Sequence, residues 1–211
     1  MRAVLFDWDG TLVNSAEATF RCYQRMFSSQ GIAFDAETFQ RSYSPDWHQT
    51  YRAVGLPEDK WAAMDEVFTE EYVRENSQLL PGALDVLRRL GSLGVAQGVV
   101  TSGNRKRVLQ ELDRFEISPF FATVICHEDT PNKKPHPEPL LVALEELVVP
   151  HSAAVYVGDS PEDVEMARAA GVYSVGIPGG FPNHDALSAA EPDMLAPSLE
   201  KALAKLLDDA A

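Results

Sequence analysis

The chain has 211 residues, of which 45% are hydrophobic and 24% charged, and its formal net charge at pH 7 is −14. This length supports one sizeable core, or a core with a smaller insertion. The negative charge argues against binding to nucleic acid or to an anionic membrane, because both require a basic surface.

The N-terminus enters an apolar strand directly, without the basic region and cleavable apolar segment of a signal peptide. No apolar run approaches the roughly 20 residues that span a bilayer. We therefore expect a soluble, cytoplasmic protein. Cys22 and Cys126 are isolated and lack metal-ligand spacing. We expect two buried thiols, and a single disulfide is the alternative.

The first motif joins an apolar run, residues 2–6, to two carboxylates, Asp7 and Asp9, and then to Gly10. Such a run is typical of a buried parallel strand, and open α/β sheets bind ligands just beyond the carboxyl ends of their strands. Residues two apart in an extended backbone point to the same side, so both carboxylates can converge on one ligand. The alternative is a solvated turn. A calcium loop is disfavoured because its twelfth position would be Ala18 rather than Glu.

Residues 15–78 are predicted to be helical and amphipathic, with apolar side chains at helical spacing. Breaks at Gly31, at Ser44-Pro45 and at residues 55–57 divide this segment into about four helices, with Asn14-Ser15 as a plausible cap for the first. No convincing strand is found there. We therefore predict an inserted α-helical cap domain over residues 15–79.

From Pro81-Gly82 onward, helical and strand patterns alternate. The predicted elements are a helix over 83–90 ended by Gly91, a strand over 95–100, a helix through 108–115, a strand over 121–126, a helix through 140–147, a strand over 153–157, a helix closing at Gly171, a strand over 173–177 and a helix over 199–207. This alternation predicts an α/β fold, a Rossmann-like parallel sheet with helices on both faces. The core is discontinuous and comprises residues 1–14 and 80–211.

A polar segment follows the strand predicted over residues 95–100. Thr101-Ser102-Gly103-Asn104 offers hydroxyls, backbone N–H groups and a following helix N-terminus, which suit a phosphate oxygen. The alternative is simple helix capping by Ser102 or Asn104.

Lys134 precedes a proline in a rigid loop, where a fixed ammonium can neutralise a phosphate and a carboxylate together. The alternative is a solvated lysine, as we expect for Lys133. Asp159 follows Gly158 at a strand end and can complete a magnesium site with Asp7. Asp163 falls at the third helical position after Ser160, the usual place of a capping box, and it can also hold Lys134 or a metal-bound water.

Together these groups favour phosphoryl transfer. Asp7 would attack phosphorus and form an aspartyl phosphate, and Asp9 would protonate the leaving oxygen and later deprotonate the hydrolytic water. Magnesium and Lys134 would spread the charge of the transferring group, with Thr101 holding an equatorial oxygen. The expected ligand is a small phosphorylated metabolite.

The chain resembles the haloacid dehalogenase-like hydrolase superfamily and, within it, the phosphoglycolate phosphatase-like group. Four motifs carry the resemblance: Asp7-Trp8-Asp9-Gly10-Thr11-Leu12, the strand ending at Thr101, Lys134-Pro135-His136-Pro137, and Gly158-Asp159-Ser160-Pro161-Glu162-Asp163. The resemblance implies a mobile cap, Mg²⁺ dependence and hydrolysis of phosphate esters. It also implies that Asp7, Asp159 and Asp163 serve the metal site and that Asp9 binds the metal through its backbone carbonyl.

Asn14 departs from the Asp often found at that position in relatives, but it lies at the start of the cap. The cap resembles the family less and usually selects the substrate. Trp47, His48 and Arg52 are conceivable substrate contacts, with ordinary cap surface as the alternative.

Three rival functions stay open. A sugar phosphomutase of the β-phosphoglucomutase type would use the same fold, but Gly158-Asp159 is closer to the phosphatase pattern than to the Glu-Asp of those mutases. A dehalogenase would need neither Asp9 as a second acid nor magnesium. A catalytically silent interaction module would be expected to lack a motif residue, and none is missing.

Overall fold

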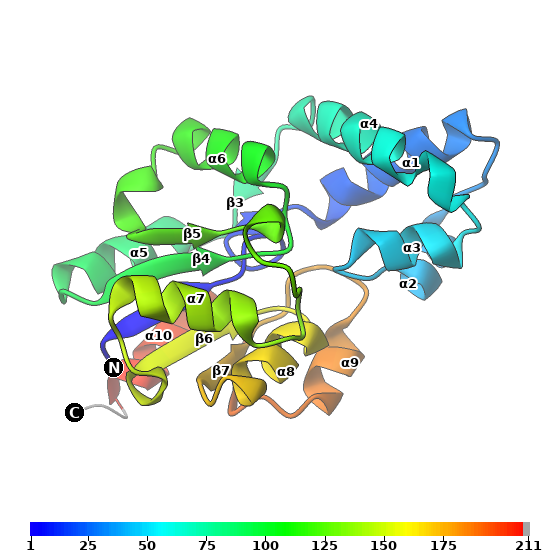
Figure 1. Cartoon of the computed structure of the whole chain (residues 1–211). Coiled ribbons are helices and arrows are strands. Elements are labelled where there is room, and N and C mark those ends of the chain that lie inside the picture. Colours follow the sequence, from blue (N-terminus) through cyan, green and yellow to red (C-terminus); the bar gives the residue numbers. More distant parts are fainter. Residues whose placement is uncertain (209–211) are drawn as a thin grey trace. The chain divides into compact units, whose positions relative to one another are not determined.

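The computed structural model describes residues 1–208, which form two compact units (Figure 1). The larger unit contains residues 1–14 and the chain from Leu79 onward, and the smaller contains Ser15–Gln78. The sequence-based boundary assigned Leu79 to the insertion, whereas its contacts place it with the larger unit. A short separate sheet pairs β2 (Val13–Asn14) with β3 (Gln78–Leu79).

A six-stranded sheet forms the centre of the larger unit, with strand order β5-β4-β1-β6-β7-β8 and every neighbouring pair parallel. The strands are β1 (Ala3–Phe6), β4 (Ala96–Val100), β5 (Thr123–Ile125), β6 (Ala154–Gly158), β7 (Tyr173–Gly176) and β8 (Met194–Leu195). The parallel α/β class predicted from the alternating pattern is confirmed.

Strand β1 lies at the point where the strand order changes direction. Its last residue, Phe6, pairs with Val99 of β4 on one side and with Val157 of β6 on the other. In open parallel sheets, the crevice beyond the carboxyl end of such a strand is where ligands bind. Asp7 is the next residue of the chain.

Alternate residues of β1 enter different cores, because successive side chains of a strand point to opposite faces. Val4 and Phe6 belong to one buried cluster, and Ala3 and Leu5 to another. The first cluster is completed by α5 (Ala83–Ser92), α6 (Arg105–Arg114) and α10 (Leu199–Asp208), and the second by α7 (Glu138–Leu147) and α8 (Pro161–Ala169). Figure 1 shows α7 and α8 in front of the sheet and α5 and α10 behind it.

The smaller unit contains four α-helices, α1 (Ala16–Ser29), α2 (Ala36–Ser42), α3 (Trp47–Ala53) and α4 (Trp61–Val73). Asp35 and Asp46 cap α2 and α3 by accepting bonds from the backbone N–H groups of Thr38 and His48. Stacked and tilted aromatic rings fill its interior. The ring centroids of Tyr23, Phe27 and Phe34 lie 4.8–5.7 Å apart.

Several details differ from the sequence-based prediction. Helix α5 continues through Gly91 to Ser92, and the chain turns at Gly94, whose φ is +70°. Ser15 occupies the N-cap position of α1, but its hydroxyl makes no capping bond. Helix α9 (His184–Ala189), strand β8 and four 3₁₀ turns were not predicted. These turns span Glu58–Lys60, Ser118–Phe120, His127–Asp129 and His151–Ala153.

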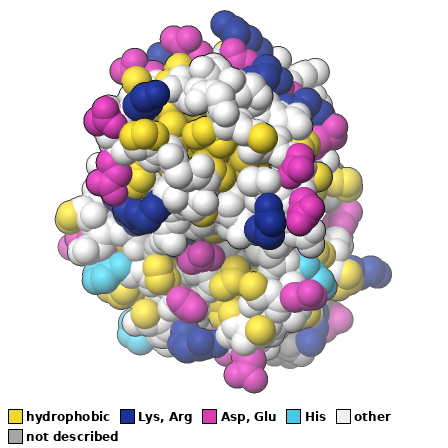
Figure 2. All heavy atoms as spheres, turned by 90° about the vertical axis from the view of Figure 1, so that its right-hand side faces the viewer, with side chains coloured by type: hydrophobic (Ala, Val, Ile, Leu, Met, Phe, Trp, Pro, Cys, Tyr) yellow, Lys and Arg dark blue, Asp and Glu magenta, His cyan; other side chains and the backbone are white. Residues whose placement is uncertain are grey.

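Cys22 and Cys126 are free and buried, which confirms the expectation of two thiols. Acidic and basic side chains are interspersed on the face shown in Figure 2. Among the described residues, no helix combines the length and the apolar composition needed to cross a membrane.

Candidate active site

The turn after β1 fixes the first two predicted carboxylates. The carbonyl oxygen of Trp8 accepts bonds from the N–H groups of Leu12 and Val13, both at 3.0 Å. Gly10 has φ +79°, and a Cβ atom on it would lie 2.2 Å from Asp159 Oδ2. Only glycine therefore combines this backbone conformation with the close approach of Asp159. Asp7 is held at the strand end by a 2.9 Å bond from its N–H to the carbonyl of Val157.

The end of β6 supplies the second pair of carboxylates. Ser160 and Asp163 form the predicted capping box of α8, because Ser160 Oγ accepts from the Asp163 N–H while Asp163 Oδ2 accepts from the Ser160 N–H. Asp163 Oδ2 also accepts from the Asp159 N–H at 3.1 Å. A Cβ atom on Gly158 would lie 2.4 Å from Asp163 Cγ, so this packing requires glycine before Asp159.

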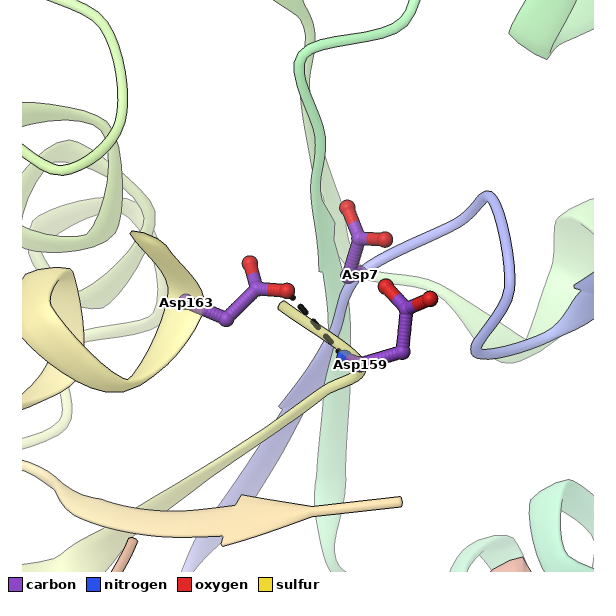
Figure 3. Close-up of side chains that lie close together, drawn as sticks. All are labelled: Asp7, Asp159 and Asp163. Carbon is purple, nitrogen blue, oxygen red and sulfur yellow. Dashed lines mark hydrogen bonds between the residues drawn. The ribbon is translucent and has the colours of Figure 1, made fainter. Parts of the chain in front are cut away.

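Asp7, Asp159 and Asp163 converge on one point, as Figure 3 shows. Each offers a carboxylate oxygen, and these oxygens all lie within 4.8 Å of one another. All three residues are buried. Asp159 Oδ2 is buried and has no hydrogen-bond partner among the described residues. An orphaned carboxylate oxygen is costly in a protein interior, and it marks the place where a cation would be stabilised.

Lys134 connects two of these carboxylates. Its ammonium lies 2.6 Å from Asp7 Oδ1 and 2.6 Å from Asp163 Oδ1, and its side chain is only 4% exposed. The expectation that Lys133 is solvated was wrong. Its ammonium donates to the carbonyl oxygens of His127 and Thr130 and so closes the loop that presents Lys134.

Burial and mutual repulsion perturb the protonation of the cluster. Burial raises the pKa of Asp7 to about 7, with Lys134 opposing this rise and Asp163 adding to it. Burial, and then the charges of Asp7 and Asp163, raise the pKa of Asp159 well above its usual range. Burial alone would lower the pKa of Lys134, but the carboxylates of Asp163 and Asp7 outweigh it and raise that pKa. One lysine therefore does not neutralise three buried carboxylates, and Asp7 and Asp159 tend to take up protons.

The segment predicted to bind phosphate follows β4, the strand beside β1. Phe6 pairs with Val99, so the residues that follow, Asp7 and the end of β4, lie at the same edge of the sheet. Thr101 is buried, and its Oγ1 accepts a 2.9 Å bond from the Gly103 N–H. Asn104 is the N-cap of α6, as the capping alternative predicted, and Ser102 is partly exposed in the same turn.

The side chain of Asp9 is not part of the three-carboxylate group and is bound instead by helix α6. Arg107 Nη1 donates to Asp9 Oδ1 at 3.0 Å, and Arg107 Nη2 donates to Asp9 Oδ2. Arg107 Nη1 also donates to Glu111 Oε2 at 3.0 Å, and Trp8 Nε1 donates to the same oxygen at 2.8 Å. The sequence reasoning missed Arg107 and Glu111. The available signal was their position beside Val108 and Leu112 on the apolar face of α6.

Tyr156 of β6 was also missed. Its hydroxyl lies 2.8 Å from the carbonyl oxygen of Val100 and 3.1 Å from Asp163 Oδ1. This places it between the end of β4 and the cluster, beneath Lys134, whose ammonium is 5.3 Å from the centroid of the Tyr156 ring.

Comparison with known proteins identifies the family. The model of the haloacid dehalogenase-like hydrolases matches residues 4–177 of this chain. The protein belongs to this family. The phosphoglycolate phosphatase of Escherichia coli strain K12 is 30% identical to it, with 98% of this chain and 92% of the relative covered.

Two further relatives cover most of this hydrolase. The candidate pyrophosphatase PpaX of Caldanaerobacter subterraneus is 32% identical, with 90% of this chain and 88% of the relative covered. The crystal structure of a candidate β-phosphoglucomutase from Thermotoga maritima has a TM-score of 0.78 at 26% identity, with 99% of each chain covered. The predicted family and enzyme class are thus confirmed.

The side chains of this hydrolase fit the divalent cation that the family implies. Three buried carboxylates and one ammonium leave a formal charge of −2 when all are ionised, and Asp159 offers an oxygen without a partner. Oxygen ligands with one or two carboxylates suit Mg²⁺. Both oxygens of Asp163 are already hydrogen-bonded, to Lys134 and to the capping box, so Asp7 and Asp159 are the better donors.

The cap residues named from the sequence form a cluster within the helical unit. Trp47 Nε1 and His48 Nε2 lie 2.8 and 3.0 Å from the two oxygens of Asp65, and His48 stacks on Trp61 with centroids 4.7 Å apart. Arg52 lies over the same ring, 5.1 Å from its centroid. Packing within the unit accounts for these contacts, and a role in substrate binding stays a prediction.

Proposed function

We propose that this hydrolase is a Mg²⁺-dependent phosphatase that cleaves a small phosphate monoester through an aspartyl phosphate on Asp7. The observation that carries the proposal is the ammonium of Lys134 held 2.6 Å from both Asp7 and Asp163 at the carboxyl end of β1, beside the unpartnered oxygen of Asp159. This arrangement joins a carboxylate nucleophile to fixed positive charge, as phosphoryl transfer requires.

Asp7 is the nucleophile in this proposal. Its Oδ1 is paired with Lys134, which leaves Oδ2 to attack phosphorus in line. Lys134 orients Asp7 and neutralises charge on the transferring group, and Tyr156 and Asp163 hold Lys134 in place. When bound, Mg²⁺ would stabilise negative charge on the phosphoryl oxygens. Asp7 and Asp159 would hold it, with the backbone carbonyl of Asp9 as the further ligand implied by the family and Asp163 supporting the site.

Asp9 serves as the acid and base in the same scheme. It would protonate the leaving oxygen and then remove a proton from the water that attacks the aspartyl phosphate. The Thr101 turn would receive phosphate oxygens through its hydroxyl and N–H groups, with Ser102 and Gly103 contributing and Asn104 capping the helix behind them. Lys134 would contact the same phosphate.

Phosphoglycolate is the substrate we propose to test first. The Escherichia coli relative is named a phosphoglycolate phosphatase, and the similarity covers 92% of its length. The decisive measurement is phosphate release from phosphoglycolate, sugar phosphates, nucleotides and pyrophosphate, with Mg²⁺ and with chelator. Mg²⁺-dependent release from a monoester supports the proposal, and an Asp7→Asn variant should lower kcat by at least about 10⁴-fold. A variant that keeps substantial activity would remove Asp7 as the nucleophile.

A phosphomutase is the second candidate, since one structural neighbour is described that way. The close packing of Gly158 against Asp163 argues against it, because the Glu of the mutase pattern would place side-chain atoms where Asp163 lies. Isomerisation of a sugar phosphate without phosphate release would favour the mutase. A chain without either activity would favour the interaction module.

A further inference from the structure

A buried ionic network extends from the candidate acid and base into helix α6. Arg107 donates to both oxygens of Asp9 through its two terminal nitrogens, and Nη1, which donates to Asp9 Oδ1, also donates to Glu111 Oε2. Trp8, the residue between Asp7 and Asp9, donates to Glu111 and is fully buried. The side chains of Arg107 and Glu111 are each 7% exposed.

The main effect of this network is on the orientation of the Asp9 carboxylate rather than on the stability of the fold. A buried ion pair gains little net stability, because the cost of desolvation offsets its attraction. A bidentate guanidinium instead fixes the plane and the direction of a carboxylate. Gly103 allows the approach, since a Cβ atom there would lie 2.6 Å from Arg107 Nη2. The turn that contains Thr101 and Gly103 thus packs against the Arg107 side chain that binds Asp9.

We propose that Arg107 is a positioning residue for Asp9, anchored by Glu111 and Trp8, and that it sets where Asp9 delivers and collects its proton. The proposal rests on the proposed phosphatase function. Each oxygen of Asp9 accepts one N–H···O bond from Arg107 and keeps a second lone pair that can hold a proton. The two bonds fix the direction in which that lone pair faces, and a shift of the carboxylate that breaks one bond leaves the other in place.

The proton balance closes over one turnover. Asp7 Oδ2 bonds to phosphorus as the ester P–O bond breaks, and the proton of Asp9 moves to the departing oxygen. The resulting carboxylate of Asp9 is the form that Arg107 binds with both nitrogens. Water oxygen then bonds to phosphorus, its proton passes to Asp9, and the bond from phosphorus to Asp7 breaks. The net reaction consumes one ester and one water.

A leaving-group comparison tests the proposal, since only a poor leaving group needs a proton from Asp9. We would compare kcat/KM for phosphoglycolate, or the best alkyl phosphate of the panel, with that for p-nitrophenyl phosphate, whose product leaves as a stable anion. This parameter covers steps through departure of the leaving group. Arg107→Lys keeps the positive charge but loses the paired guanidinium donors to Asp9. We therefore expect it to lower kcat/KM for the alkyl phosphate at least about 10-fold and kcat/KM for p-nitrophenyl phosphate less than about 3-fold.

A double-mutant cycle adds a second criterion. If Arg107 acts through Asp9, then Arg107→Lys should lower the alkyl kcat/KM much less in an Asp9→Asn background than in the wild type. Arg114→Lys is the matched control, because Arg114 pairs with Oε1 of Glu111 from the same helix at 3.5 Å, whereas Arg107 pairs with Oε2. It should leave both esters unchanged. Glu111→Gln weakens the ion pair that holds Arg107 but keeps the guanidinium that binds Asp9. It should lower kcat/KM for the alkyl phosphate by a smaller factor, and again more than kcat/KM for p-nitrophenyl phosphate.

Equal losses on both esters, additive effects with Asp9→Asn, or no loss in Arg107→Lys would each overturn the proposal. Thermal melts establish that the variants fold, and Glu111→Gln carries the test if Arg107→Lys does not. Failure of the proposed function looks different, because wild-type protein with Mg²⁺ would then hydrolyse neither ester.

Discussion

Adjacent lysines in the loop after β5 have different partners and therefore different energetic roles. Lys133 donates to backbone carbonyls, whereas Lys134 bonds to two buried carboxylates. Their order in the sequence does not distinguish them, and only the proline after Lys134 favoured it as the positioned one. Removing the charge of Lys134 leaves Asp7 and Asp163 without their shared counter-charge, and this predicts a cation-dependent loss of stability.

For Lys134→Met, we expect the free energy of unfolding in chelator to fall by about 3–5 kcal/mol, the range for breaking a buried ion pair. Mg²⁺ should restore part of this loss, because a divalent cation supplies positive charge at the same carboxylates. Lys133→Met is the matched control and should lose about 1–3 kcal/mol irrespective of Mg²⁺. Urea unfolding of both variants with chelator and with Mg²⁺ measures the difference. Equal responses to Mg²⁺ would contradict the assigned site.

The raised pKa of Asp7 predicts how the stability of the metal-free protein depends on pH. Its pKa is about 7 in the folded chain and 3.8 in the reference state. The native state therefore binds more protons than the unfolded state between these values, so the free energy of unfolding falls as pH rises from about 4 to 7. The stabilising contribution is present below pH 4 and is lost by about pH 7. Asp159, whose pKa is also raised by burial, adds a fall of the same sign.

Urea unfolding in chelator at pH 5, 6, 7 and 8 tests this dependence. Asp7→Asn should flatten the fall, since a neutral amide does not titrate. Asp85→Asn makes the same change in net charge at a side chain that is 83% exposed, and its pH profile should match that of the wild type. A wild-type profile that rises between pH 5 and 7 would be inconsistent with a buried, crowded carboxyl at position 7.

The elements show which parts of this fold are encoded locally. Apolar runs bounded by glycine, proline and polar clusters predicted five of the six strands of the main sheet, because buried parallel strands require such runs. Strand β8 has two residues, Met194 and Leu195, and exists only because it pairs with β7. Helix α9 has 6 residues, fewer than two turns. Segments this short carry too few residues for a periodic pattern.

The candidate site likewise contains residues that local patterns predict and residues that they do not. Its motif residues lie at strand ends, so the topology that the sequence predicted brings them to one edge. The bond from Arg107 to Asp9 joins residues 98 apart in the chain, and the bond from Trp8 to Glu111 joins residues 103 apart. No local pattern specifies such partners. Charged residues on the apolar face of α6 signalled that partners existed, but not which.

Gly91 offers a direct test of the helix boundary that the sequence placed wrongly. Glycine usually ends helices, but here α5 continues past it, and a Cβ atom would have only Gln97 Nε2 within 4 Å, at 3.7 Å. We expect Gly91→Ala to stabilise the protein by about 0.5–1 kcal/mol, because alanine loses less backbone entropy in a helix. Urea unfolding measures the gain. Gly94→Ala, at φ +70° with open space around it, should instead destabilise, and a destabilising Gly91→Ala would place the helix end at residue 91.

Across the whole molecule, a net charge of −14 makes cations stabilising in two different ways. Any salt screens the repulsion among dispersed acidic groups such as those in Figure 2. A bound divalent ion instead acts at one place, the cluster of Asp7, Asp159 and Asp163. The two effects differ in their dependence on ionic strength and on single side chains, so stability measurements can separate them.

Mg²⁺ at 100 times its Kd should raise the free energy of unfolding by about 2.7 kcal/mol, if it binds only the native state. NaCl at equal ionic strength should produce only the smaller screening gain. Asp159→Asn removes the charge beside the unpartnered oxygen and should abolish the Mg²⁺-specific part, while the screening part persists. Asp85→Asn, with the same change in net charge, should retain both. If Asp159→Asn keeps the full Mg²⁺ gain, or if NaCl reproduces it in the wild type, the stabilising cation does not bind at the end of β1 and the metal assignment of this cluster is wrong.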